Sequence, residues 1–125
     1  MNSASSPSIN HPLDGQLPSP SLIEMFAFAD FEFVIIDNEH GAAGLETTEN
    51  MLRVARASGI IPVVRCLEQD ITRTLDMGAS VIKVPMFNTA AQARRLVDQV
   101  RYPPMGRRGC TFSASAAGCG VRRFE

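Results

Sequence analysis

Three short and largely apolar segments of the chain are typical of buried β-strands. Residues 31–37 contain the uninterrupted run Phe33-Val34-Ile35-Ile36, residues 60–65 are apolar up to Arg65, and residues 81–84 end at a proline. Apolar runs of this length, bounded by charged or turn residues, favour parallel strands covered on both faces.

Four segments with apolar side chains three and four positions apart predict helices around these strands. The first helix begins with Ser19 as its N-cap and Pro20 at the first helical position. The last helix begins with a capping box formed by Thr89 and Gln92. Between them we expect helices over 45–58, ended by Gly59, and over 71–77.

Three of the four predicted helices have an apolar stripe that we expect to face the core. The stripe of the first helix consists of Leu22, Met25, Phe26 and Ala29. That of the helix over 45–58 consists of Thr48, Met51, Leu52 and Ala55, and that of the last helix consists of Ala93, Leu96, Val97 and Val100.

Helices and strands therefore alternate, which predicts an α/β fold whose strands are parallel because each connection passes through a helix. Such a fold is either an open sheet or part of a (β/α)8 barrel. A barrel needs roughly 250 residues, so the 125 residues of this chain supply about half. We assign residues 1–18, rich in Ser, Pro and Asn, to an irregular segment and residues 19–125 to one partial domain.

Composition is that of a globular protein, with 45% hydrophobic and 20% charged residues, and excludes a disordered tail. Residues 1–50 contain eight of the 13 acidic residues and none of the 12 basic ones. Three cysteines without a CxxC pair argue against a disulfide framework. The first 24 residues contain no Lys or Arg and no long apolar run, so we expect a cytoplasmic protein without a secretory signal or membrane span.

Candidate catalytic residues cluster where the first two strands end, with Asp37, Glu39 and His40 after one and Arg65 at the end of the other. The carboxyl ends of parallel strands meet at one edge of a sheet, where active sites of α/β proteins form. This set offers a general base, carboxylates to orient it, and a cation for an anionic substrate.

Each of these residues also has an interpretation without catalysis. His40 can be a loop histidine bonded to its neighbours, and Arg65 a surface residue paired with Glu68 or Asp70. Asp37 and Glu39 can complement the positive end of the following helix. The residues alone leave these alternatives open.

The chain resembles the HpcH/HpaI aldolase family in four segments that occur in the same order. Residues 31–41 are similar to its strand ending in DxEH, and residues 62–65 to its PxVR strand. The other two matches are residues 78–86, similar to its GAxGixvPmv strand, and residues 101–109, similar to RYPPxGxRG.

The resemblance implies a metal-dependent class II aldolase on a (β/α)8 barrel, which cleaves or forms 4-hydroxy-2-oxo acids to give pyruvate and an aldehyde. It implies that His40 acts as acid and base, that Asp37 orients it as a dyad, and that Arg65 binds the substrate and stabilises the enolate. The implied cofactor is Mg²⁺, Mn²⁺ or Co²⁺, the partners are a 2-oxo acid and an aldehyde, and the full-length family forms homo-oligomers.

The chain departs from the family at both ends. Its first 18 residues contain no convincing first strand, and the family's metal ligands would lie beyond residue 125, so no metal ligand is assigned here. We therefore expect a chain truncated after the first half of the barrel, without appreciable aldolase activity by itself. As a half barrel it would present open strand edges and self-associate.

Two further alternatives come from the basic residues. Lys83, the only lysine, could form a Schiff base, although a strand-edge lysine that extends into solvent is the simpler interpretation. The arginines of the second half could bind nucleic acid. We expect no nucleic-acid or membrane partner, because few aromatic residues lie among these arginines.

Overall fold

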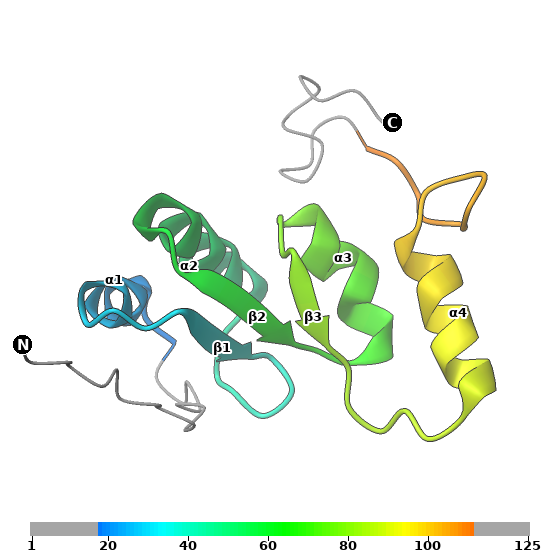
Figure 1. Ribbon diagram of the computed structural model, residues 1–125, viewed down its shortest axis with the longest axis horizontal. Coiled ribbons are helices and arrows are strands. Elements are labelled where there is room, and N and C mark those ends of the chain that lie inside the picture. The colour runs from blue at the N-terminus through cyan, green and yellow to red at the C-terminus, as the bar shows by residue number, and fades with distance from the viewer. Residues whose placement is uncertain (1–17, 112–125) are drawn as a thin grey trace, which may run out of the picture.

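Helices and strands alternate along the chain in the order that the hydrophobic pattern predicts (Figure 1). The computed structural model describes residues 18–111, so nearly all of the predicted irregular segment 1–18 lies outside the described residues, as do Cys119, Arg122 and Arg123. The elements are α1 (Pro20–Phe28), β1 (Phe33–Asp37), α2 (Leu45–Ser58), β2 (Ile61–Arg65), the 3₁₀ turn η1 (Glu68–Asp70), α3 (Ile71–Asp76), β3 (Val81–Lys83) and α4 (Ala90–Val100).

The three strands form one parallel sheet in the order β1-β2-β3, which confirms the predicted α/β class. Asp37 of β1 is the register partner of Arg65 of β2, and Arg65 is in turn the partner of Lys83 of β3. The carboxyl ends of the three strands therefore lie in one row. Because register partners on neighbouring strands point to the same face of a sheet, these three charged side chains share one face and one edge.

The other face of the sheet forms the core with the helices. Val34, Ile36 and Val64 are buried there against α2, whose Met51 and Leu52 are also buried. The alternate residues of the strands point away from this core and include Phe33, Ile61 and Val81, which are 47%, 52% and 41% exposed.

Helix α2 has the bounds and the buried stripe that the sequence predicts, with Thr48, Met51, Leu52 and Ala55 all buried. It ends at Gly59, whose φ of 76° is the left-handed conformation that glycine adopts at little cost. Polar residues on the opposite side of α2 leave only one face suited to the core. The hydrophobic pattern therefore predicts the buried face of this helix correctly.

The predicted inner stripe of α1 is wrong for Met25 and Ala29, although its Phe26 packs against the core. Ile23 is the buried residue of this helix, whereas Met25 is 62% exposed and Ala29 lies beyond the last helical residue. Helix α1 is apolar on nearly every side, so several stripes fit its sequence. Its contact with α2, beside which it lies in Figure 1, turns the face with Ile23, Phe26 and Ala27 toward the core.

The predicted inner stripe of α4 is wrong for Ala93 and Val97, which are exposed, whereas the predicted capping box is confirmed. None of its residues is buried, and Val97 is 44% exposed. Leu96 and Val100 alone among the predicted stripe pack against the core. Helix α4 lies at the outer end of the molecule (Figure 1), where it packs mainly against the six-residue α3.

Cys66 directly follows β2 and is a core residue rather than a reactive one. Its side chain is fully buried, and burial raises the pKa of its thiol. A protonated buried thiol behaves as a small apolar group. Cys66 and Cys110 are both free, as the cysteine spacing predicts.

Candidate active site

Asp37 and Arg65 form the centre of the candidate site at the carboxyl ends of β1 and β2. Arg65 Nε donates to Asp37 Oδ1 at 2.9 Å, and the Nη2 atom of Arg65 donates to Asp37 Oδ2. The Asp37 side chain is 5% exposed and that of Arg65 is 22% exposed. Two parallel charge-assisted bonds of this kind fix both side chains in one orientation.

The charge state of Asp37 follows from this pairing. The hydrogen bonds from Arg65 hold the pKa of the Asp37 carboxyl well below its usual range, because they favour the charged form more than burial disfavours it. The backbone N–H groups of Glu39 and His40 act in the same direction. Asp37 is therefore a permanent carboxylate and not an acid or base at neutral pH.

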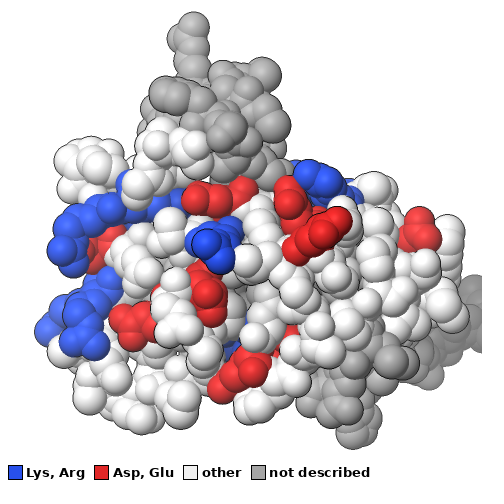
Figure 2. Space-filling model, turned by 180° about the vertical axis from the view of Figure 1, so that it is seen from behind, with Lys and Arg blue, Asp and Glu red and all other residues white. Residues whose placement is uncertain are grey.

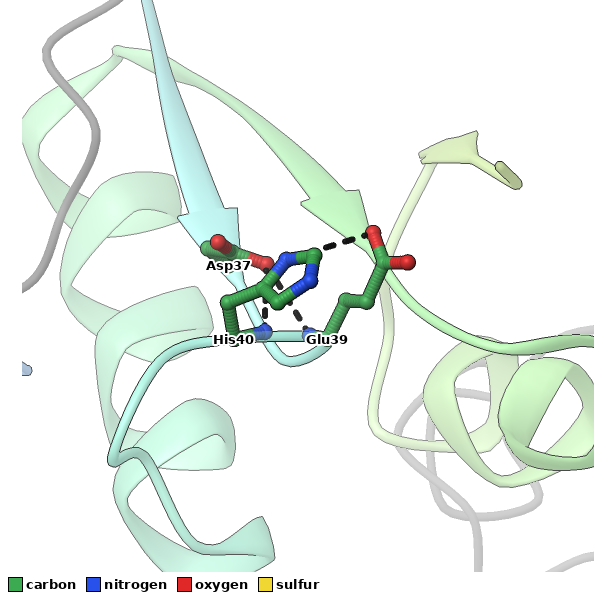
Figure 3. Close-up of side chains that lie close together, drawn as sticks. All are labelled: Asp37, Glu39 and His40. Atoms are coloured by element: carbon green, nitrogen blue, oxygen red, sulfur yellow. Dashed lines mark hydrogen bonds and ion pairs between the residues drawn. The ribbon is translucent and has the colours of Figure 1, made fainter. Parts of the chain in front are cut away.

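Asp37 also shapes the turn that follows β1. Its Oδ1 accepts hydrogen bonds from the backbone N–H groups of Glu39 at 2.9 Å and of His40 at 3.3 Å (Figure 3). At Gly41 the backbone passes so close to the carbonyl oxygen of Asp37 that a Cβ atom would lie 2.0 Å from it. This tight turn presents the His40 side chain at the surface, 70% exposed.

The imidazole of His40 lies between a cation and an anion. Its Nδ1 is 3.3 Å from Arg65 Nη2 and 3.6 Å from Glu39 Oε2, and that carboxylate oxygen is 3.5 Å from Arg65 Nε. A guanidinium can only donate, so in its contact with Arg65 the neutral ring accepts at Nδ1 and carries its proton at Nε2. A ring protonated at both nitrogens would direct Nδ1–H to Glu39 instead.

The structure thus brings together all three predicted site residues, Asp37, His40 and Arg65. The alternative pairing of Arg65 with Glu68 or Asp70 is wrong, because Arg65 pairs with Asp37 and Glu39. Asp37 contacts His40 through the backbone N–H, and Arg65 connects the Asp37 carboxylate to the imidazole. Glu39, to which the family resemblance assigns no role, contacts both Arg65 and the imidazole of His40.

Asp37, Glu39 and His40 are also close enough to hold a metal ion, since one ligand atom from each lies within 4.8 Å of the others. The chemistry of the set does not fit. Both oxygens of Asp37 already accept hydrogen bonds from Arg65. The same guanidinium also contacts the imidazole of His40 and the carboxylate of Glu39. A divalent cation would have to displace this guanidinium charge, so we assign no metal ligand within residues 18–111.

Two arginines of the segment after α4 pair with acidic residues. Figure 2 shows basic side chains gathered over the α4 end of the molecule with acidic side chains close by. Arg107 pairs with Asp98, and Arg108 pairs with Asp76 at 2.9 Å while lying 4.6 Å from the centre of the Tyr102 ring. These pairings account for the two arginines as structural contacts that hold the segment after α4.

A cleft of about 530 Å³ lies at the opposite, amino-terminal edge of the sheet. It is lined by the ends of α2 and α3 and the start of β2, and none of the candidate site residues contributes to it. No helix among residues 18–111 is long and apolar enough to cross a membrane.

Comparison with known proteins places these observations in a family. A family model described as HpcH/HpaI aldolase/citrate lyase matches residues 16–119. A hydroxypyruvate/pyruvate aldolase from Cupriavidus necator is 38% identical over 96 residues, which is 74% of this chain and 36% of the relative. A 2-keto-3-deoxy-L-rhamnonate aldolase from Salmonella gallinarum is 33% identical over 77% of this chain and 37% of its own length.

Solved structures agree with this relationship. An HpcH/HpaI aldolase/citrate lyase family protein from Burkholderia cenocepacia superposes with a TM-score of 0.74 at 33% identity, covering 86% of this chain and 46% of that one. The citrate synthase SbnG superposes with a TM-score of 0.72 at 39% identity over 76% of this chain and 40% of its own. The predicted partial barrel is confirmed, and the chain spans little more than a third of the length of the curated relatives.

Proposed function

The chain belongs to the HpcH/HpaI aldolase/citrate lyase family, and from this premise we propose that its carboxyl-edge cluster is the acid/base part of a pyruvate-type aldolase site. The reaction is cleavage or formation of the carbon–carbon bond of a 4-hydroxy-2-oxo acid, with pyruvate and an aldehyde as the products. The observation that carries the proposal is the contact between the imidazole of His40 and the guanidinium of Arg65, which Asp37 holds in place.

In the cleavage direction, the 4-hydroxyl group loses a proton while the C3–C4 bond breaks and an enolate forms. We assign the proton transfer to His40, whose imidazole can exchange its contact with Arg65 for one with Glu39 as it becomes protonated. Arg65 stabilises the negative charge that develops on the oxygen of the 2-oxo acid. Asp37 is a positioning residue, because it fixes Arg65 and the backbone of His40.

The family implies a divalent metal ion, Mg²⁺, Mn²⁺ or Co²⁺, which would supply further stabilisation of the enolate oxygen. We propose that its ligands are residues other than those described here, since the Asp37, Glu39 and His40 set does not fit it.

A hybrid barrel tests this function in a complete active site. Residues 19–111 replace the matching segment of the Cupriavidus necator aldolase, and pyruvate release from a 4-hydroxy-2-oxo acid is measured with each metal. We expect an active hybrid in which His40→Ala lowers the rate by about 10²- to 10⁴-fold, the usual contribution of a positioned proton-transfer group. We expect no appreciable release by the 125-residue chain alone.

The matched control is Arg53→Ala, which removes an exposed cation that pairs with Glu49 on α2, away from the site. Its hybrid should keep full activity. A His40→Ala hybrid with the activity of the unmodified hybrid would contradict the assignment of proton transfer to this residue.

A further inference from the structure

Lys83 is the charged residue of the candidate site that the proposed chemistry does not use. It ends β3 and is the register partner of Arg65, so it points to the same face of the sheet as Arg65 and Asp37. Neighbouring strands lie about 5 Å apart, which places the Lys83 backbone about that far from Arg65 on the side away from Asp37. Its side chain is exposed.

The two cations of this row differ in what surrounds them. Arg65 makes two bonds to Asp37 and an ion pair with Glu39, so two carboxylates already offset its charge. Lys83 has no ion pair with any carboxylate of residues 18–111. The Lys83 ammonium group is therefore a second cation at this edge, and no carboxylate of residues 18–111 offsets its charge.

From this arrangement we infer that Lys83 binds a second anionic group on the substrate, such as the carboxylate at the far end of a 2-oxo diacid. The inference rests on the proposed function, because it takes the 2-oxo acid group to lie at Arg65. A short carbon chain covers the spacing from Arg65 to Lys83 across one strand. Lys83 is thus a specificity residue that favours 2-oxo acids with an anionic tail over those with a neutral tail.

Calorimetric titration of the 125-residue chain with two matched probes tests this role. The probes are 2-oxoadipate, which has a carboxylate at each end, and 2-oxohexanoate, which has the same length and only one. We expect 2-oxoadipate to bind about tenfold more tightly, as one charge-assisted hydrogen bond implies. Lys83→Met should abolish this preference without changing the affinity for 2-oxohexanoate, and Lys83→Arg should retain it.

Arg94→Met is the control for net charge, because it removes one positive charge from the exposed surface of α4. It should leave the preference for 2-oxoadipate intact. A preference that persists in Lys83→Met, or that Arg94→Met weakens equally, would overturn the inference. So would a covalent adduct at Lys83 after borohydride reduction with either probe, since that would identify a Schiff base in place of an ion pair.

These outcomes separate the inference from the proposed function. If 2-oxohexanoate binds and 2-oxoadipate binds no more tightly, the role of Lys83 fails while a 2-oxo acid site remains. If Lys83→Met removes a real preference and the hybrid barrel releases no pyruvate, the role of Lys83 holds and the proposed reaction fails. Binding of neither probe would overturn the inference.

Discussion

At the scale of single residues, Asp37 determines the arrangement of the candidate site. One oxygen of its carboxylate receives the backbone N–H groups of Glu39 and His40, and both oxygens receive the guanidinium of Arg65. The side chain is almost fully buried, so the loss of its charge would leave Arg65 without its main partner in a partly desolvated position. Its contribution should therefore be visible in the stability of the whole chain.

Asp37→Asn should lower the free energy of unfolding at pH 6 by about 3 kcal/mol, near the lower end for removal of one partner of a buried pair. The difference from wild type should shrink as the pH falls below about 4, the usual pKa of an unfolded aspartate. The pKa of Asp37 is lower in the folded chain, so the unfolded state takes up its proton first and the stabilisation present at higher pH is lost. Urea unfolding between pH 2 and 6 measures this.

Glu49→Gln is the control for this measurement, because Glu49 forms an exposed pair with Arg53 within α2. Its effect should stay below about 0.5 kcal/mol. A wild-type advantage over Asp37→Asn that stays constant from pH 6 to pH 2 would contradict the account of Asp37.

The contact between Asp37 and Arg65 could be predicted from the sequence only in part. Parallel strand order predicts that Asp37 and Arg65 reach the same edge of the sheet. Their direct contact depends on the register, which aligns residues 28 positions apart in the chain. A slip of one residue would send Arg65 to the opposite face, and the sequence pattern does not fix the register that closely.

At the scale of elements, the turn between β1 and α2 depends on glycine for a steric reason. A Cβ atom at Gly41 would overlap the carbonyl oxygen of Asp37, whereas one at Gly44 would meet nothing within 4 Å. We expect Gly41→Ala to lower the free energy of unfolding by about 1–3 kcal/mol, as overpacking does, and Gly44→Ala to change it by less than about 1 kcal/mol. Equal effects in urea unfolding would contradict this interpretation of the turn.

Helix α4 should be the first described helix to open. None of its residues is buried, whereas α2 buries four, so its local stability depends more on the capping box. Thr89→Ala should cost about 1 kcal/mol and speed amide hydrogen exchange in α4 about fivefold, with α2 unchanged. Equal acceleration in both helices would mean that α4 unfolds only with the whole domain.

The same two helices show what an apolar stripe can and cannot predict. The stripe of α2 was predicted correctly because polar residues occupy its other sides. The stripes of α1 and α4 were predicted only in part. Contact with α2 selects the inner face of α1, and packing beside the short α3 selects that of α4. In both cases the missing information lies in the neighbouring element.

At the scale of the whole molecule, the helices cover one face of the sheet and the site lies at the carboxyl edge of the other. That other face also exposes Phe33, Ile61 and Val81. The alternation of helices and strands was enough to predict this architecture, since it requires only the hydrophobic period and the rule that crossover connections make strands parallel. The sequence pattern does not predict that a cleft lies at the amino-terminal edge of the sheet, opposite the charged cluster. That arrangement is visible only in the folded structure.

The central claim is that the carboxyl-edge cluster, and not the cleft at the amino-terminal edge, binds a 2-oxo acid. Titration of the chain with pyruvate, followed in two-dimensional ¹H–¹⁵N NMR spectra, tests it most directly. We expect the largest chemical-shift changes at the amides of residues 37–41 and of Arg65. Shifts concentrated instead on Ile60 and Gly78, which line the cleft, or no shifts at residues 37–41, would contradict it.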